Sequence, residues 1–345
     1  MIKAGIIGAN GYTGMQLMQI LSHHKYVEIT HIVSRSNAGT KVCSMYPNLE
    51  NLKDKYFEEL DIEKMAENDV VFLALPHAKS AEIGAKLYKL GTKIIDLSAD
   101  FRYNDVNIYE NTYKVTHPDK ELLKKSIYGL TEIYRDKIKT GKIIGNPGCY
   151  TTCSILPLYP LLKDKLIETN SIIIDAKSGV TGAGKKCEDN LMFSEVNENF
   201  KAYAVTTHRH TSEIEQELSL AAGSDIKLSF TPHLLPLQRG IFATIYANLK
   251  NDIKAVDIKT SFDKFYKNEF FISVNHEGIL PELKNVRNSN FVQIGYKIDS
   301  RLQRIIITAV LDNLVKGASG QAVQNMNLMF DLDETEGLKF NSMYV

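Results

Sequence analysis

The stretch IKAGIIGANGYTG, residues 2–14, decides how the chain begins to fold. The part up to Ile7 predicts a buried strand, and the part from Tyr12 predicts an apolar-periodic helix that continues to about Ser22. A second strand is expected at Glu28–Val33. The chain therefore opens with a strand–helix–strand unit whose first turn is rich in glycine.

This turn places Gly8, Gly11 and Gly14 in the spacing G-x-x-G-x-x-G. The spacing is a variant of the dinucleotide fingerprint, in which small residues let a pyrophosphate approach backbone N–H groups at a helix N-terminus. Alone it is weak evidence, but here it follows a strand and opens a helix, as the fingerprint requires. We therefore predict a dinucleotide site in this loop.

Ser34, Arg35 and Ser36 end the second strand, where a protein that binds NAD would offer a carboxylate to the ribose 2′-hydroxyl. A guanidinium and two hydroxyls suit a 2′-phosphate instead, so the segment favours NADP over NAD. The alternative is that Arg35 is a solvated loop charge.

Strands and helices continue to alternate, with strands expected at Asp69–Leu75 and Lys93–Leu97, which predicts a parallel sheet. Pro76, next to a histidine, and the segment Ser98–Arg102 follow these strands at the edge where doubly wound sheets bind ligands. We expect these segments to line the cofactor crevice. The alternative is that Pro76 belongs to a plain connection between a strand and a helix, and that Arg102 is only a surface charge.

The stretch GNPGCYTTC, residues 145–153, places a thiol between a short strand, Lys142–Ile144, and a helix expected at Tyr150–Leu162. Cys149 therefore lies at a helix N-terminus, where unpaired N–H groups and the helix dipole favour a thiolate over a thiol. This position predicts a nucleophile. Cys153, one turn along, is expected to be a packing residue, as most cysteines are.

After this helix the chain is rich in strands. The predicted strands are Ser171–Lys177, Lys227–Thr231, Gly240–Leu249, Phe291–Ile298 and Arg304–Leu314. Such runs suggest a mixed or antiparallel sheet with one face covered by helices. The predicted fold is α/β: a Rossmann-type dinucleotide-binding domain, residues 1–148 with the C-terminal helical segment 317–345, and an α+β catalytic and oligomerisation domain, residues 149–316, with a mixed sheet.

A second set of chemical groups lies in THRHTSEIEQEL, residues 207–218, where His208 and His210 flank Arg209 before a predicted helix that Thr211 can cap. An imidazole beside a cysteine thiolate serves as general acid and base, because the unperturbed pKa of histidine lies close to working pH. His-x-His also occurs among metal ligands, but no third ligand has a suitable spacing, so we predict no metal.

The segment SGVTGAGKK, residues 178–186, is rich in glycine and hydroxyl groups, ends with two lysines and directly follows a predicted strand. It either cradles a phosphate or a carboxylate or forms a flexible surface loop.

Composition limits the class of partner. The 345 residues suggest two domains, and 41 basic residues balance 41 acidic ones, so no basic field exists to gather nucleic acid. The 4 cysteines show no paired spacing, which argues against disulfides and fits a reducing cytoplasm. No apolar run reaches the roughly 18 residues of a membrane helix. We expect a cytoplasmic protein with small-molecule partners.

Taken together, these motifs resemble the N-acetyl-gamma-glutamyl-phosphate reductases of arginine biosynthesis, which are related to the aspartate-semialdehyde dehydrogenases. The resemblance spans nearly the whole chain and implies a dinucleotide-binding domain closed by the C-terminal helix. It also implies a catalytic domain that forms the interface of a homo-oligomer, a dimer or tetramer, and an essential cysteine at the position of Cys149. It rests on GANGYTG (8–14), LSADFR (97–102), GNPGCYTT (145–152), SGVTGAGK (178–185), HRHTSEIEQEL (208–218), FTPHLLPLQRGI (230–241) and GASGQAVQNMNLMF (317–330).

By analogy with the semialdehyde dehydrogenases, whose catalytic histidine follows an arginine, His210 is a better catalytic candidate than His208. Lys185 stands where the family commonly has arginine and offers a point charge instead of a bidentate fork. Ser212 stands where many relatives have proline. The substrate-binding residues implied are Ser178, Gly179, Lys185, His208, Arg209 and Arg239. The cofactor-binding residues expected are Gly8, Asn10, Gly11, Tyr12, Thr13, Gly14, Ser34, Arg35, Ser36, Pro76 and Asn325.

The activity implied is reduction of N-acetyl-L-glutamyl 5-phosphate by NADPH. Cys149 would attack the acyl phosphate, and hydride delivered to the resulting thioester would give the semialdehyde. Two alternatives stay open. A reductase of the same architecture would act on aspartyl or aminoadipyl phosphate, and a chain of another class would be a non-catalytic NADP-binding sensor.

Overall fold

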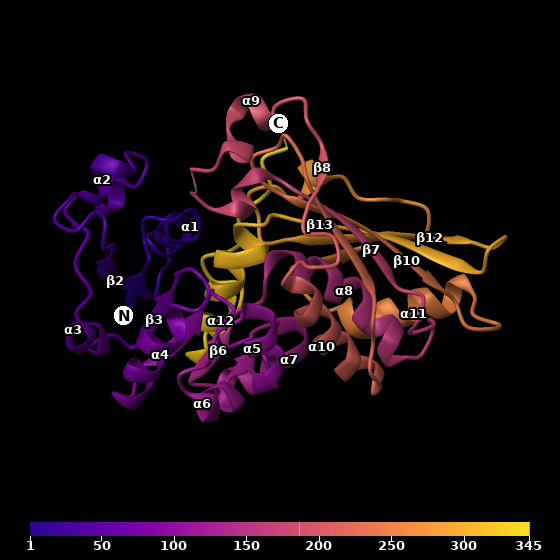
Figure 1. The fold of residues 1–345 in the computed structure, drawn as a ribbon, viewed down its shortest axis with the longest axis horizontal. Helices are drawn as coiled ribbons and strands as arrows, with labels where there is room; N and C mark the ends of the chain where they lie inside the picture. Colours follow the sequence, from indigo (N-terminus) through magenta and orange to yellow (C-terminus); the bar gives the residue numbers. More distant parts are fainter. Residues whose placement is uncertain (186, 345) are drawn as a thin grey trace. The chain divides into compact units, whose positions relative to one another are not determined.

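The computed structural model describes residues 1–185 and 187–344, so Lys186 and Val345 lie outside the described residues. The chain groups into two compact units, residues 1–148 with 318–340, and residues 149–317 with the chain after Phe340 (Figure 1). The sequence suggested that all of 317–345 would join the first unit. The last residues group with the second unit instead, where the N–H of Met343 donates to the carbonyl of Arg287 at 3.2 Å.

The first unit is built on a parallel sheet of six strands in the order β2-β1-β3-β4-β6-β5. Its strands are β1 (Ile2–Ile7), β2 (Val27–Val33), β3 (Val70–Leu73), β4 (Lys93–Asp96), β5 (Ile127–Tyr128) and β6 (Ile143–Gly145). Its helices are α1 (Tyr12–Leu21), α2 (Val42–Met45), α3 (Ile62–Ala66), α4 (Ser80–Lys89), α5 (Val106–Tyr113), α6 (Lys120–Lys125), α7 (Thr131–Thr140) and α12 (Gly320–Met329).

Parallel strands are buried on both faces and therefore read as continuous apolar runs. All residues of β3 are buried, as are the last four of β1. Strand β2 lies on one side of β1, whereas β3 and then β4 lie on the other side. Because crossovers are right-handed, α1, which connects β1 to β2, and α4, which connects β3 to β4, lie on opposite faces of the sheet. The reversal falls between β1 and β3. Ligands of doubly wound sheets bind at the carboxyl edge of such a switch point, where the glycine loop lies.

The second unit is built on a mixed sheet of seven strands in the order β11-β12-β13-β10-β7-β9-β8. Its strands are β7 (Ile173–Ser178), β8 (Lys201–Ala202), β9 (Ser229–Leu234), β10 (Ile241–Asn248), β11 (Ile272–Val274), β12 (Val292–Asp299) and β13 (Arg304–Leu311). Its helices are α8 (Cys149–Lys163), α9 (Phe193–Val196), α10 (His210–Ala222) and α11 (Ala255–Tyr266), and a π-helical segment, η5, spans Val315–Ser319. The predicted α/β fold, with a parallel and a mixed sheet, is confirmed.

Helix α8 lies against β10 and β13, and α10 and α11 pack beside it, so these three helices cover one face of the sheet (Figure 1). Strand β10 shows the result, because its residues alternate between buried and half-buried from Ile241 to Asn248. On the other face, Ile173 keeps 43 % of its surface exposed. One face of the sheet is therefore largely uncovered in the single chain.

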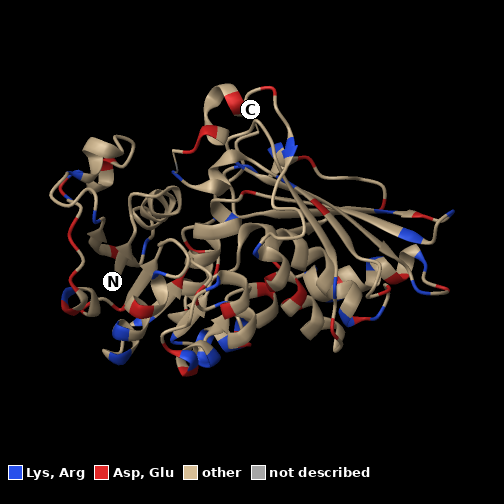
Figure 2. Ribbon diagram, viewed as in Figure 1, with Lys and Arg blue, Asp and Glu red and all other residues tan. Residues whose placement is uncertain are grey.

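The charges are spread over both units. Figure 2 shows Lys and Arg interspersed with Asp and Glu along the ribbon, with no region of a single sign. This agrees with the balanced composition of 41 basic and 41 acidic residues. Among the residues that the structure describes, no helix is both long enough and apolar enough to span a bilayer.

Candidate active site

The predicted nucleophile lies where the sequence placed it, at the first residue of α8. Cys149 is partly exposed, and none of the cysteines forms a disulfide. No acidic residue lies in the first turn of the helix. A thiol at a helix N-terminus, partly open to solvent and without a nearby acid in its own turn, is in the environment that makes cysteines reactive.

Cys153 contrasts with it. Its thiol is fully buried and contacts the carbonyl of Ala309 at 3.4 Å. Burial, with the proximity of Cys149, raises the pKa of the Cys153 thiol. It is an inert packing residue, as expected.

A residue that the sequence analysis missed supports the nucleophile. Gly317, in the π-helical segment, approaches so closely that a Cβ atom on it would lie 2.7 Å from the Cβ of Cys149. Only glycine fits there. Its position in the GASG motif was the available signal, but only the fold reveals that the motif packs against the thiol residue.

The two histidines have different surroundings. The Nδ1 atom of His208 accepts the N–H of His210 at 3.1 Å, so the proton of the neutral ring is on Nε2. Burial, with the charge of Arg209, lowers the pKa of His208 to about 4, which keeps the ring neutral at working pH. The ring of His210 lies 4.9 Å from that of His208, centroid to centroid, at the first residue of α10. His208 therefore holds the start of the helix, and His210 is the remaining candidate for proton transfer.

The structure corrects the prediction that Thr211 caps this helix. Because α10 begins at His210, Thr211 lies inside the first turn, and the N-cap position belongs to Arg209, whose side chain makes no capping hydrogen bond. The N–H of Thr211 donates to the carbonyl of His208 instead. Ser212, the departure from proline, donates its hydroxyl to the carbonyl of Arg209 at 3.2 Å.

Tyr150, next to the nucleophile, joins it to the histidines. Its ring packs edge-on against His208 at 5.6 Å and His210 at 6.1 Å. Its hydroxyl receives a hydrogen bond from Tyr203 at 3.2 Å and donates to the carbonyl of His233 at 3.1 Å. Burial raises the pKa of the Tyr150 phenol, so it stays protonated. The sequence analysis did not single out either tyrosine.

The segment after β7 forms a turn whose backbone bonds the segment before β10, with the N–H groups of Val180 and Thr181 donating to the carbonyls of Leu237 and Gln238. It forms a 3₁₀ turn at Val180–Ala183, and the hydroxyl of Thr181 donates to the carbonyl of Gln238 at 2.6 Å. Ser178 is buried and donates its hydroxyl to the carbonyl of Gly179 at 2.9 Å, while Lys185 is exposed. Lys186 of the predicted motif lies outside the described residues.

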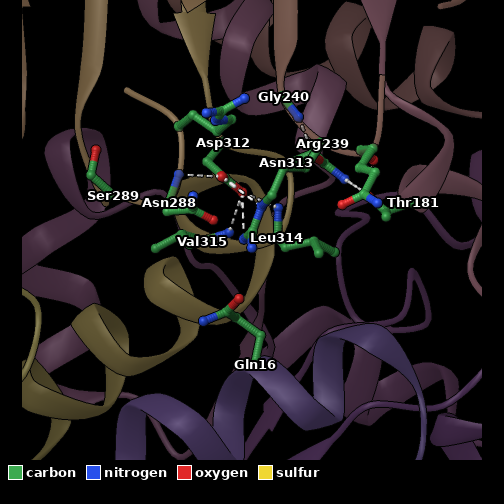
Figure 3. Close-up of polar contacts among 12 residues, drawn as sticks. Gln16, Thr181, Arg239, Gly240, Asn288, Ser289, Asp312, Asn313, Leu314 and Val315 are labelled. Carbon is green, nitrogen blue, oxygen red and sulfur yellow. Dashed lines mark hydrogen bonds and ion pairs between the residues drawn. The ribbon is translucent and has the colours of Figure 1, made fainter. Parts of the chain in front are cut away.

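Of the other predicted substrate residues, Arg209 is exposed, and Arg239 forms a two-point ion pair with Asp312 (Figure 3). Its Nε and Nη2 atoms lie 2.8 and 2.9 Å from the two carboxylate oxygens. Figure 3 shows Asp312 between Arg239 and the backbone of Asn288. The sequence analysis proposed Arg239 but missed its partner.

The glycine loop of the first unit fits a bound dinucleotide. A Cβ on Gly8, whose φ is +88°, would clash with the carbonyl of Ala74, and one on Gly14 would lie 2.6 Å from the backbone of Ala9. A Cβ on Gly11 would have no neighbour nearer than 3.7 Å, and Gly11 precedes α1 without a side-chain cap. The first and third glycines thus permit a tight turn and close helix packing, and the second leaves space beside the helix N-terminus.

The end of β2 is tied to this loop. The amide of Asn10 donates to the hydroxyl of Ser36 and to Asn37, both at 3.0 Å. Ser34 is buried and also donates to Asn37, at 3.1 Å, whereas Arg35 and Ser36 are exposed. Asn37 was not predicted. Its side chain organises the segment, so Arg35 and Ser36 are the residues available to a ligand.

Asn325, predicted to contact the cofactor, is engaged by residues of its own unit. It is fully buried in α12, where its amide donates to Gly129 and Asn146 and accepts from Thr131. One turn earlier, the side-chain oxygen of Gln321 is buried with no hydrogen-bond partner in the part of the chain described. A buried acceptor without a donor is costly, so Gln321, although it is as buried as Asn325, is a further candidate for a ligand contact from this helix.

The two predicted crevice segments differ. Pro76 is exposed after β3, as a ligand contact requires. Arg102 is buried and donates to the carbonyls of Asn146 at 2.6 Å and Leu97 at 3.0 Å, so it is no surface charge. Across residues 1–185 and 187–344, no group of three or more His, Cys, Asp or Glu is arranged to hold a metal ion.

Comparisons with known protein families identify both units. Residues 3–141 match the family described as semialdehyde dehydrogenase, NAD binding domain, and residues 149–313 match semialdehyde dehydrogenase, dimerisation domain. The fold agrees with solved structures. Aspartate semialdehyde dehydrogenase II from Vibrio cholerae has a TM-score of 0.73 at 18% identity, over 96% of this chain and 99% of that chain. Aspartate semialdehyde dehydrogenase from Candida albicans, solved with NADP, has a TM-score of 0.68 at 19% identity, over 96% of this chain and 98% of that chain. The fold and site are thus those of a semialdehyde dehydrogenase-like protein.

The curated relatives narrow the class. The N-acetyl-gamma-glutamyl-phosphate reductase of Acetivibrio thermocellus is 51% identical over 100% of both chains. That of Caldicellulosiruptor bescii is 54% identical over 98% of both. The chain belongs to the N-acetyl-gamma-glutamyl-phosphate reductase family.

Proposed function

We propose that this protein uses NADPH to reduce N-acetyl-L-glutamyl 5-phosphate to N-acetyl-L-glutamate 5-semialdehyde, with release of phosphate, in arginine biosynthesis. The observation that carries the proposal is the position of the partly exposed Cys149 at the start of α8, in a chain about half identical to reductases of that name. Membership of the family supports the substrate, and the site supports the chemistry.

The first step belongs to Cys149. Its thiolate attacks the acyl carbon, the bond to the phosphate oxygen breaks, and phosphate leaves with that bond's electrons, which gives a thioester. The N-terminus of α8 favours the anionic sulfur before attack. The hydrogen-bonded hydroxyl of Tyr150 and the backbone of Gly317 fix the position of this turn.

The glycine loop, Asn10, Arg35 and Ser36 are proposed to hold the cofactor. When bound, NADPH supplies the hydride that reduces the thioester carbonyl. The space beside Gly11 admits a pyrophosphate, and the exposed guanidinium of Arg35 is available to a 2′-phosphate.

His210 is proposed as the proton carrier. The reduced carbon carries an oxyanion that takes a proton, and release of the aldehyde requires that proton to leave as the thiolate departs. His210 lies beside Tyr150, the neighbour of the nucleophile, and His208 accepts its N–H. Ser178, Gly179, Lys185, Arg209 and Arg239 remain the candidates to bind the carboxylate and phosphate.

The reverse reaction tests the proposal. Purified protein should reduce NADP when given N-acetylglutamate semialdehyde and phosphate, and activity should be lost when phosphate is omitted. Aspartate semialdehyde in the same assay is the control for a relative of other specificity. If the protein acted on aspartate semialdehyde and not on N-acetylglutamate semialdehyde, the substrate would be reassigned. If it acted on neither semialdehyde, the remaining function would be NADP binding without catalysis.

We also propose that the protein is a homo-oligomer that associates through the uncovered face of the second sheet, and that it works in the cytoplasm, where its thiols stay reduced. The exposed Ile173 on β7 and the half-buried Tyr246 on β10 lie on that face. Light scattering should give a multiple of 38.8 kDa, and Tyr246→Lys should lower it. A monomeric wild type would reject the proposal.

A further inference from the structure

Asp312 directly follows β13 and is completely buried. Its carboxylate accepts a hydrogen bond from Nη2 of Arg239, and Nε of Arg239 lies 2.8 Å from the other carboxylate oxygen as an ion pair. Further hydrogen bonds come from the backbone of Asn288 at 2.6 Å, Leu314 at 2.9 Å and Val315 at 3.2 Å (Figure 3). A buried carboxylate is tolerated only when it is paired and hydrogen-bonded in this way.

The same residue is connected to the nucleophile. Its backbone carbonyl accepts the N–H of Gly317 at 2.9 Å, and its carboxylate binds the N–H groups at the start of the π-helical segment. Gly317 in turn packs against Cys149. Asp312 therefore fixes the turn on which Cys149 rests.

Arg239 is held at both ends and remains accessible. Its side chain keeps 18% of its surface exposed, against 0% for Asp312. The backbone of the next residue, Gly240, donates to the side chain of Asn313 at 2.6 Å. Strand pairing places Ile241, the residue after that, opposite Ser178 at the end of β7. The guanidinium is thus bound to Asp312, the residue whose backbone carbonyl holds Gly317 beside Cys149.

We propose that Asp312 is a positioning residue of the reductase. It orients Arg239 so that the exposed part of the guanidinium binds the anionic group of the acyl-phosphate substrate, and it sets the turn that supports Cys149. The proposal rests on the proposed function for the identity of the substrate. Its physical basis is that a two-point guanidinium–carboxylate pair fixes the plane of the guanidinium, which a single contact does not.

A purely electrostatic role predicts the opposite sign. If Asp312 only neutralised Arg239, Asp312→Asn would make the site more positive and would strengthen the binding of anions. If Asp312 positions Arg239, the same substitution releases the guanidinium and weakens the binding of anions. The sign of the change distinguishes the two roles.

The experiment compares alkylation of Cys149 by iodoacetate, an anion, and by neutral iodoacetamide, followed by mass spectrometry of the Cys149 peptide. The ratio of the two rate constants reports the oriented positive charge beside the thiol and needs no turnover. The variants are Asp312→Asn, Arg239→Lys and the double substitution. Asp299→Asn is the matched control, because Asp299 makes the same two-point pair with the exposed Arg301 at the other end of the sheet.

We expect Asp312→Asn to lower the iodoacetate preference about tenfold, the size of one charge-assisted hydrogen bond. In the reverse assay, KM for phosphate or for the semialdehyde should rise by a similar factor while KM for NADP is unchanged. Arg239→Lys should produce the same loss, and the double variant should lose little more, because both changes remove one interaction. Asp299→Asn should change neither quantity.

The proposal is overturned if the preference for iodoacetate stays constant or rises in Asp312→Asn. It is also overturned if the effects of the two single substitutions add in the double variant. Should Asp312→Asn fail to fold, Arg239→Lys decides, because it keeps the charge without the fork. A wild-type preference in Arg239→Lys overturns the proposal as well. A wild-type protein that turns over no semialdehyde rejects the proposed function, while the alkylation ratio still tests Asp312.

Discussion

At the scale of single residues, Cys149→Ala should abolish turnover and leave the affinity for NADP nearly unchanged. We propose that the thiol forms the acyl intermediate, whereas the glycine loop proposed to hold the dinucleotide belongs to the other unit. Steady-state assays and a fluorescence titration with NADPH measure the two quantities. Cys153→Ala is the matched control, since its buried thiol only packs, and it should cost some stability and little activity. A Cys149→Ala protein with substantial turnover would contradict the assignment.

The histidines give the second prediction. His210→Asn should lower kcat by roughly 10²–10⁴, the range of a general acid or base. His208→Asn should do less, because burial lowers the pKa of His208 to about 4 and an asparagine oxygen can also accept the N–H of His210. The comparison needs both variants assayed at saturating substrate. The reverse ranking would move the proton carrier to His208.

The third prediction concerns the preference for NADPH and tests Arg35. Arg35→Asp removes a guanidinium that we expect to bind the 2′-phosphate and adds a repelling charge, so affinity for NADPH should fall by about tenfold or more while the NADH reaction is comparatively intact. Ser34→Ala is the contrasting variant, because its hydroxyl is buried against Asn37. Kinetics with both cofactors decide, and an unchanged NADPH-to-NADH ratio in Arg35→Asp would show that Arg35 is a solvated loop charge.

At the scale of elements, α8 shows how a helix that carries a nucleophile tolerates two internal prolines. Pro160 has no N–H to offer the carbonyl of Leu156, four residues earlier. The hydroxyl of Tyr266, from α11, donates to that carbonyl at 2.6 Å and replaces the missing bond. The neighbouring helix thus supplies a donor that the sequence of α8 lacks.

Tyr266→Phe should therefore destabilise the second unit by about 1–3 kcal/mol, because it leaves a buried carbonyl without a donor. Denaturant unfolding measures the change. Pro160→Ala in the Tyr266→Phe background restores the backbone N–H and should recover part of the loss, so the two substitutions should be non-additive. Equal, additive losses would show that the Tyr266 bond does not compensate for Pro160.

The elements also show what the sequence could predict. Strand β1, the glycine loop and the start of α8 follow from local patterns, since each is defined by residues within a few positions. The short helices α5 and α6 were not predicted, although Asp105 and Asp119 are N-caps whose side chains accept N–H bonds, a signal present in the sequence.

The partners of site residues could not be predicted. Arg239 and Asp312 are 73 residues apart, and Gly317 meets Cys149 only after β13 has paired with β10. Asn325 belongs to a family motif, but its burial depends on residues near 130 and 146 that the motif does not contain. Local patterns specify elements, whereas these contacts depend on the register of the sheet and on helix packing.

At the scale of the whole molecule, two buried carboxylates couple the stability of the first unit to pH. Asp100 accepts the N–H groups of Ala78, Ser80 and Ala81 at the start of α4, together with the hydroxyl of Tyr109. These donors suit a charged carboxylate. Asp96 is equally buried, and burial, with the charge of Asp100, raises the pKa of Asp96 to about 7. One of the two carboxyls therefore keeps a proton that it would lose in the unfolded chain.

The sign of the effect follows from linkage. Because the pKa of Asp96 is higher in the folded protein than its ordinary value of 3.8, the folded state binds more protons than the unfolded state between about pH 4 and 7. The contribution of Asp96 to stability is complete below pH 4 and is lost as the pH rises through 7. Asparagine in its place stays neutral at every pH, and its amide can still pair with Ser98, which now donates to Asp96 at 2.8 Å.

The melting temperature of Asp96→Asn should accordingly rise relative to wild type as the buffer is changed from pH 5 to pH 8. The control is Asp333→Asn in the same unit, where hydrogen bonds from Thr335 hold the pKa of Asp333 below its ordinary value. That substitution should lower stability by a constant amount over this range, since the wild-type group is charged throughout it. Parallel pH profiles for Asp96→Asn and wild type would mean that Asp96 is ionised in the folded protein and that its burial beside Asp100 is balanced by its hydrogen bonds.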